Sequence, residues 1–212
     1  MADSRLYVHV LLDRSGSMES CRDKTIEAFN AYVKSLEAQS KAGTRISLTT
    51  FDTESTDLVF DAVRIADMPK LTHELFVPRG GTPLFDAVAA VVARIDKVNL
   101  LAEERVAITI LTDGEENASR EMTADAVRRM LIDRQERQNW LVQYLGANQD
   151  AWKAGAQIGV GPAHAINFGV ASIAPAMQTV ATSAKRFRGA APEDAREAAA
   201  FTSTERASAK GE

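Results

Sequence analysis

Short apolar runs alternate along the chain with segments whose apolar residues recur at helical spacing. The first run, residues 6–12, is almost continuously apolar, which is typical of a strand buried on both faces of a parallel sheet. The short turn at residues 52–55 favours an antiparallel strand near the sheet edge directly after it. The remaining runs predict strands at 46–51, 58–63, 106–111, 140–145 and 165–168.

The intervening segments predict amphipathic helices. The helix after the first strand carries its apolar residues at Ile26, Phe29, Val33 and Leu36. The next helix begins at Pro83, a residue favoured in the first turn, and presents Leu84, Val88, Val91 and Ile95 on one side. Thr123 is expected to cap a helix that runs through Arg137, and Asp150 a short helix that ends near Gly159. A last long helix is predicted from residue 172 to about residue 187.

Strands that alternate with helices imply parallel βαβ units with right-handed crossovers. The predicted fold class is therefore α/β: a doubly wound, mostly parallel sheet flanked by helices, with one antiparallel edge strand. We expect residues 1–188 to form one domain and residues 189–212 a C-terminal tail that is partly helical or disordered. Residues 202–205 resemble a capping box, although little chain remains for a helix after them.

Composition and charge limit the kinds of partner and the cellular setting that the sequence favours. The chain has 212 residues, 45% hydrophobic, with a net charge of −4, which gives no electrostatic case for binding nucleic acid or an anionic membrane. The basic group at residues 185–188 is interpreted as a solvated helix face. The single cysteine, Cys21, excludes an intramolecular disulfide. No signal peptide and no run of about 18 apolar residues is found, so a cytoplasmic protein is expected.

Polar residues that can hold a ligand follow the predicted strands. Asp13, Ser15 and Ser17 come directly after the first strand, Asp113 follows the strand at 106–111, and Thr82 opens the helix before that strand. Open α/β sheets bind ligands at the carboxyl ends of their strands, near the point where the strand order reverses. We therefore expect these residues, far apart in sequence, to meet at one site.

These five residues offer a metal ion only oxygen ligands. Three hydroxyls and two carboxylates favour Mg²⁺ or Mn²⁺ and disfavour zinc or copper. Gly16 allows a tight loop, and Gly80 and Gly81 let the backbone approach an ion. A competing interpretation is that Asp13 and the two serines only cap a turn, since these residue types favour turns and helix N-caps.

Three motifs resemble a known family. Residues 13–18 (DRSGSM), 80–84 (GGTPL) and 111–116 (LTDGEE) are similar, in the same order, to the parts of the metal-ion-dependent adhesion site (MIDAS) of von Willebrand factor A domains. The resemblance covers about the first 170 residues. Residues 116–120 (ENASR) and 145–150 (LGANQD) further resemble small stand-alone bacterial and phage members.

The resemblance implies a Rossmann-like von Willebrand A fold with an intact MIDAS. It also implies that Ser15, Ser17 and Thr82 bind the metal directly in the ligand-bound form, whereas Asp13 and Asp113 act through water. A Glu or Asp of a partner protein is then expected to complete the coordination. The expected function is a divalent-cation-dependent protein-interaction module, an adaptor or assembly factor with no catalytic residues, for which self-association stays open.

Two other functions compete with this one. The first is a Mg²⁺-dependent phosphohydrolase with Asp13 as nucleophile. Such sites carry a second carboxylate two positions later, where this chain has Ser15, and no suitably placed lysine follows the middle strands. The second is a structural oligomer component whose metal only stabilises the fold, which a partner-independent gain in thermal stability would favour.

Several further residues are weaker candidates. Three acids and one amide follow the ends of predicted strands: Glu115, Glu116, Asn148 and Asp150. They either shape the choice of partner and orient water molecules, or they only cap helices and face solvent. Arg79 and Arg120 are candidates for attracting an acidic partner segment. The three histidines lack zinc-ligand spacing, and His9, inside an apolar strand, is interpreted as a hydrogen-bonded core residue.

Overall fold

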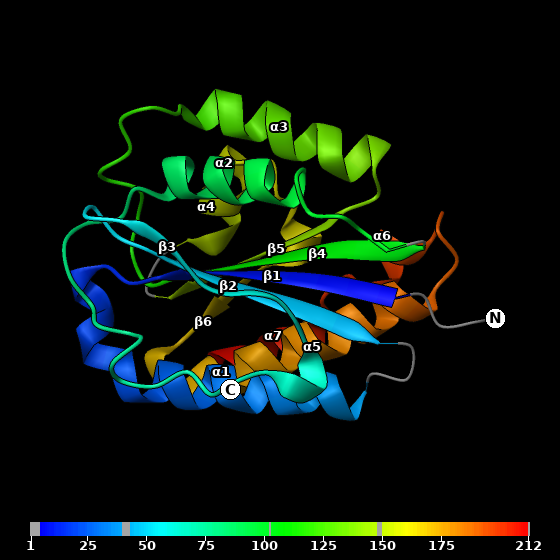
Figure 1. The fold of residues 1–212 in the computed structure, drawn as a ribbon, viewed down its shortest axis with the longest axis horizontal. Helices are drawn as coiled ribbons and strands as arrows, with labels where there is room; N and C mark the ends of the chain where they lie inside the picture. Colours follow the sequence, from blue (N-terminus) through cyan, green and yellow to red (C-terminus); the bar gives the residue numbers. More distant parts are fainter. Residues whose placement is uncertain (1–4, 40–42, 102, 148–149, 212) are drawn as a thin grey trace.

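The computed structural model describes residues 5–39, 43–101, 103–147 and 150–211, and it contains a six-stranded sheet with the order β3-β2-β1-β4-β5-β6 (Figure 1). Only β3 runs antiparallel to its neighbour. The predicted fold class and the antiparallel edge strand are confirmed, with strand ends that differ from the predicted ones by at most two residues. The strands are β1 Arg5–Asp13, β2 Thr44–Phe51, β3 Thr56–Arg64, β4 Glu104–Thr112, β5 Leu141–Ala147 and β6 Ala165–Phe168.

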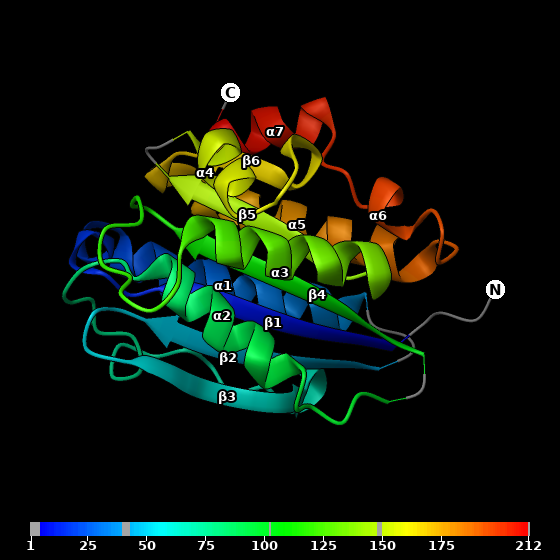
Figure 2. The same cartoon turned by 90° about the horizontal axis from the view of Figure 1, so that it is seen from above.

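Helices cover both faces of the sheet (Figures 1 and 2). One face carries α2, α3 and α4, and the other carries α1 and α5, with α7 beside α5. No helix in the described ranges is long and apolar enough to cross a membrane. The helices are α1 Arg22–Ala38, α2 Leu84–Ile95, α3 Ala124–Arg137, α4 Ala151–Gln157, α5 Ile173–Gly189, α6 Ala195–Ala198 and α7 Ser203–Lys210.

The central strand β1 is buried on both faces, as its apolar run predicts. Side chains alternate across a strand, so Leu6, Val8, Val10 and Leu12 join the core under α1 and α5, whereas Tyr7 and Leu11 join the core under α2 and α3. The predicted inward residues of α1 and α2 are also buried. Two apolar layers therefore fix the sheet and leave its carboxyl edge free to carry polar loops.

The predicted helix caps form. Thr123 Oγ1 accepts a hydrogen bond from the backbone N–H of Ala126 (3.3 Å), and the Asp150 carboxylate accepts from the N–H groups of Trp152 and Lys153 (3.1 Å each). His9 lies in the core, where its Nε2 is 2.8 Å from the hydroxyl of Thr49. The prediction of a hydrogen-bonded core histidine is confirmed.

The C-terminal segment packs against α5 through the short helices α6 and α7. The capping box at the start of α7 is complete: Thr202 Oγ1 accepts from Glu205 N–H, and the Glu205 carboxylate accepts from Thr202 N–H. Arg186 on α5 binds the Glu205 carboxylate (2.7 Å), and Phe201 is buried in the core under α5. The basic group at the end of α5 is not the solvated face expected, because Arg188 is also buried.

Candidate metal site

The candidate site lies where the order of the strands reverses. The sheet runs from β1 to β2 on one side and from β1 to β4 on the other, and both β1 and β4 end at the same edge. Asp13 ends β1, and Asp113 directly follows β4. Their loops therefore diverge from a shared crevice, which is the position where open α/β sheets bind ligands.

Asp13 is held rigidly at the base of this crevice. Its side chain is fully buried, and one carboxylate oxygen accepts a hydrogen bond from the backbone N–H of Ser15 (2.7 Å). The other oxygen accepts from the hydroxyl of Thr112 on β4 (2.6 Å). Asp13 thus both shapes the turn after β1 and ties β1 to β4.

The hydroxyls lie next to each other above Asp13. Ser15 Oγ is 3.1 Å from Ser17 Oγ, and Ser17 Oγ donates a hydrogen bond to Asp113 Oδ1 (2.7 Å). Thr82 reaches the same place: a Cβ atom on Gly114 would lie 3.5 Å from Thr82 Oγ1 and 3.8 Å from Ser17 Oγ. The fold therefore brings together all five residues predicted from the sequence.

The electrostatics of the crevice favour a cation. Burial raises the pKa of Asp13 to about 6, against the opposing hydrogen bonds from Thr112 and Ser15 and with a further rise from the nearby Asp113 carboxylate. Burial also raises the pKa of Asp113, and the Ser17 hydrogen bond opposes that rise. Within the described ranges neither carboxylate forms an ion pair with a lysine or arginine. Two close carboxylates are therefore left without a positive partner.

The donor set fits a hard divalent cation. The five side chains offer only hydroxyl and carboxylate oxygens, the ligands that Mg²⁺ and Mn²⁺ prefer. No group of three or more His, Cys, Asp or Glu side chains within the described residues is arranged to hold a metal ion. A cation here would consequently depend on the serine and threonine hydroxyls, and few of its ligands would carry charge.

Thr82 is positioned by Asn117, which lies in the ENASR motif at residues 116–120 but had no role assigned to it from the sequence. The Asn117 side-chain oxygen accepts from the backbone N–H of Thr82 (2.9 Å), and the Asn117 N–H donates to the Thr82 carbonyl (3.2 Å). A Cβ on Gly81 would lie 2.8 Å from that same side-chain oxygen, so only glycine fits beside it. Nothing in the spacing of the motifs pointed to this pairing.

A buried ion-pair network supports the other side of the crevice. Arg14, between Asp13 and Ser15, binds the buried carboxylate of Asp52 (2.7 Å), and Arg79 binds the same carboxylate (3.1 Å). The N–H of Gly16 donates a hydrogen bond to the carbonyl of Gly80 (3.0 Å). Gly80 itself has a positive φ of 64°. The network joins the loop after β1 to the loops before β3 and before α2. The sequence marked Arg79 only as a candidate for attracting an acidic partner segment, and it gave no sign that Arg14 and Arg79 share Asp52.

The weaker candidates have mainly structural contacts. Glu116 accepts hydrogen bonds from the backbone N–H groups of Ala118, Ser119 and Phe85, and Asp150 caps α4. Glu115 is exposed. Asn148 lies outside the described residues.

The arginines and histidines have the following environments. Besides Asp52, Arg79 contacts Glu54 (3.2 Å), so its guanidinium already has two acidic partners. Arg120 has an exposed side chain, and its backbone N–H donates to Asp86 (2.8 Å). His73 lies 2.8 Å from an Asp23 oxygen.

The sequence matches no family model, and no curated protein sequence matches it significantly. Solved structures do resemble the fold. The von Willebrand factor type A protein from Catenulispora acidiphila has a TM-score of 0.58 at 15% identity, over 88% of this chain and 44% of that one. The von Willebrand factor domain of the type V pili tip protein Mfa5 from Porphyromonas gingivalis has a TM-score of 0.64 at 10% identity, over 90% and 98%.

A third similar structure is proximal thread matrix protein 1 from the mussel byssus with a zinc-occupied MIDAS motif, at a TM-score of 0.60 and 15% identity over 86% of this chain and 46% of that one. This chain thus spans a little under half the length of the Catenulispora and mussel proteins. At these identities the likenesses show the fold, which is that of a von Willebrand A domain.

Proposed function

We propose that this von Willebrand A fold is a divalent-cation-dependent protein-interaction module that captures a carboxylate of a partner protein. The observation that carries the proposal is the convergence of the Ser15, Ser17 and Thr82 hydroxyls beside the Asp13 and Asp113 carboxylates. When bound there, Mg²⁺ or Mn²⁺ supplies a positive centre with coordination positions that an outside oxygen can occupy.

The residues of the chain have distinct parts in this proposal. Asp13 is buried and each of its oxygens accepts a hydrogen bond, so it supplies negative charge and fixes the loop. Ser17 is exposed and Asp113 half-buried, so these two face the side from which a partner arrives. Neutral hydroxyl ligands leave a cation electron-poor, which favours binding of an anionic oxygen from outside.

A phosphohydrolase role is less well supported. A nucleophilic Asp13 would need a free oxygen facing substrate, but both of its oxygens accept hydrogen bonds and its side chain is fully buried. The position two residues later holds a serine, which cannot replace the carboxylic acid that protonates a leaving group. We therefore propose a module without catalytic residues. The bacterial or phage source, which rests on the motif resemblance, and the cytoplasmic setting belong to the same proposal.

A pull-down of binding partners with and without chelator tests the function. The bait is the wild-type protein, and Thr82→Ala is compared with it, since this variant removes one hydroxyl and leaves both carboxylates. We expect partners that bind wild type in Mg²⁺ and are lost both in EDTA and in Thr82→Ala. Partners that persist under both conditions would show that the interaction does not run through the cation.

The role of a purely stabilising metal predicts a different result. In that case Mg²⁺ raises the melting temperature of wild type, but no partner depends on the ion. Thermal melts in Mg²⁺ and in EDTA, recorded beside the pull-down, separate the two roles.

A further inference from the structure

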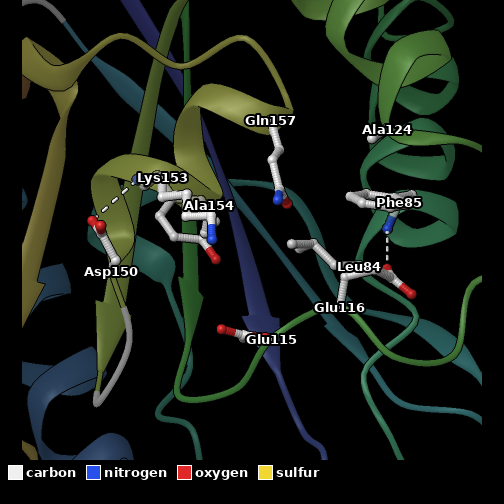
Figure 3. Close-up of a pocket in the computed structure, with 10 residues that line it drawn as sticks. Leu84, Phe85, Glu115, Glu116, Ala124, Asp150, Lys153, Ala154 and Gln157 are labelled. Carbon is white, nitrogen blue, oxygen red and sulfur yellow. Dashed lines mark hydrogen bonds between the residues drawn. The ribbon is translucent and has the colours of Figure 1, made fainter.

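A cavity of about 430 Å³ adjoins the candidate metal site, between α4 on one side and the starts of α2 and α3 on the other (Figure 3). Two pairs of lining residues lie close in sequence to the metal site. Leu84 and Phe85 come shortly after Thr82, and Glu115 and Glu116 come shortly after Asp113. A peptide residue spans about 3.5 Å. A partner residue close in sequence to a carboxylate at the cation is therefore within reach of this cavity.

The cavity combines an apolar floor with an excess of acid. Leu84 and Tyr144 are buried, and Ala124 and Ala154 add further apolar surface. The lining carries three carboxylates, those of Glu115, Glu116 and Asp150, and one ammonium, that of Lys153. Three negative charges less one positive charge leave an excess of two negative charges.

Of the three carboxylates, only that of Glu115 has both oxygens without a hydrogen bond among the described residues. Both oxygens of Glu116 accept hydrogen bonds from its own loop and from Phe85, and one Asp150 oxygen accepts two N–H groups of α4. Glu115 is exposed and accepts no recorded hydrogen bond within the described residues. In Figure 3 Glu116 points toward α2, whereas Glu115 points the opposite way, toward the α4 side of the cavity.

We propose that this cavity is a second subsite that receives a cationic side chain of the partner, arginine in preference to lysine. The methylene stem packs on Leu84 and Tyr144, and the guanidinium pairs with the Glu115 carboxylate. Arginine is favoured because its planar fork binds a carboxylate through two hydrogen bonds. This subsite rests on the proposed function: the partner segment carries an acid for the cation and, one to three residues away, a base for the cavity.

The first test measures the cavity without the metal. Nα-acetylarginine amide is titrated into ¹⁵N-labelled protein in EDTA, with Nα-acetylnorleucine amide as the neutral probe of similar length. We expect arginine-dependent shifts of backbone amide signals at the residues that line the cavity, among them 84–85, 115–116, 144, 153–154 and 157. Glu115→Gln should weaken arginine binding about threefold to fivefold, as expected for a partly exposed ion pair.

Glu121→Gln is the matched control, because Glu121 is an exposed glutamate of the same β4–α3 loop outside the cavity lining. It should bind the arginine probe as wild type does. If the arginine probe leaves these amide signals unmoved, or binds Glu115→Gln as tightly as wild type, the subsite is wrong.

The second test links the two subsites at saturating Mg²⁺. The blocked peptides Glu-Gly-Arg and Glu-Gly-Gly-Arg are compared with versions in which Arg or Glu is replaced by Gln. On wild type and on Glu121→Gln, we expect the Arg peptides to bind about threefold to fivefold more tightly than their Arg→Gln versions. On Glu115→Gln, we expect the two versions to bind equally. Equal binding of the Arg and Gln versions overturns the subsite alone. Binding that is unaffected by the Glu→Gln change in the peptide instead overturns carboxylate capture at the cation.

Discussion

Asn117 and Thr82 form a reciprocal pair of hydrogen bonds: the Asn117 side-chain oxygen accepts from the Thr82 N–H at 2.9 Å, and the Asn117 N–H donates to the Thr82 carbonyl at 3.2 Å. The pair joins the loop after β4, which carries Asp113, to the segment directly before α2. Thr82 is 2% exposed, so its backbone groups have little access to water as alternative partners. Asn117 thus sets the position of one of the three hydroxyls of the candidate site.

Replacement of Asn117 tests this positioning. Asn117→Ala leaves the buried Thr82 N–H without an acceptor, which costs about 1–3 kcal/mol of stability, and we expect weaker Mg²⁺ binding as well. Asn117→Asp retains the acceptor oxygen and should restore Mg²⁺ affinity. Calorimetric Mg²⁺ titration and urea denaturation measure the two effects. Equal Mg²⁺ affinities of wild type and Asn117→Ala would rule out the positioning role.

The two arginines that bind Asp52 are expected to contribute unequally to the stability of the fold. Arg14 has a side chain only 8% exposed, whereas that of Arg79 is 40% exposed, and both bind the same fully buried carboxylate. Arg14→Met leaves that carboxylate with one cationic partner, Arg79 at the edge of solvent, so the free energy of unfolding should fall by about 3 kcal/mol. Arg79→Met should cause a smaller loss. Urea denaturation of both variants gives the order, and a larger loss in Arg79→Met would contradict it.

The buried His9 and the half-buried His164 are expected to make the fold acid-sensitive. Burial, reinforced by the charge of Arg94, lowers the pKa of His9 to about 3, and burial beside Arg196 and Arg206 lowers that of His164 to about 4. The ordinary value is 6.5, so the unfolded chain takes up these protons first as the pH falls. Their contribution to stability is therefore complete above pH 6.5 and decreases as the pH falls from 6.5 toward the folded values.

Urea denaturation from pH 7 to pH 4.5 measures this dependence. Each histidine should account for about 2 kcal/mol of the stability lost over that interval. His164→Asn removes one titrating group and should flatten the profile by that amount. A variant profile with the wild-type slope would show that His164 does not titrate as described.

The C-terminal segment is expected to be part of the folded unit. Phe201, between α6 and α7, is 6% exposed and belongs to the core under α5, so Phe201→Ala should lower the free energy of unfolding by about 3 kcal/mol. Leu101→Ala is the control, because Leu101 is 42% exposed and its truncation should change stability by less than about 0.5 kcal/mol. Similar small losses in the two variants would mean that the segment after α5 adds nothing to stability.

The strands, the main helices and the five candidate site residues could be predicted because each depends on a local pattern. The apolar run before Asp13 had to be a doubly buried strand, and the polar residues that end it could not continue into the core. The same argument placed Asp113 after β4. Since parallel strands end at one sheet edge, the meeting of these residues followed from the topology.

The supporting contacts could not be predicted, because they depend on how loops distant in sequence approach each other. The bonds of Asn117 to Thr82 and of Arg14 to Asp52 span 35 and 38 positions and connect loops without a periodic pattern. Arg188 was expected in a solvated group, but its guanidinium is buried and donates to the carbonyl of Gln39. A charged residue at a helix end gives no local sign of such a partner.

Calorimetric titration of Mg²⁺ into wild type, Asp113→Ala and Asp125→Ala tests the central proposal most directly. Asp125 is an exposed aspartate in the first turn of α3, away from the five site residues, so its variant controls for the loss of one negative charge. We predict one Mg²⁺ site in wild type and in Asp125→Ala, and loss of binding in Asp113→Ala with the fold retained by circular dichroism. Mg²⁺ binding to Asp113→Ala with wild-type affinity would contradict a metal site formed by Asp13, Ser15, Ser17, Thr82 and Asp113.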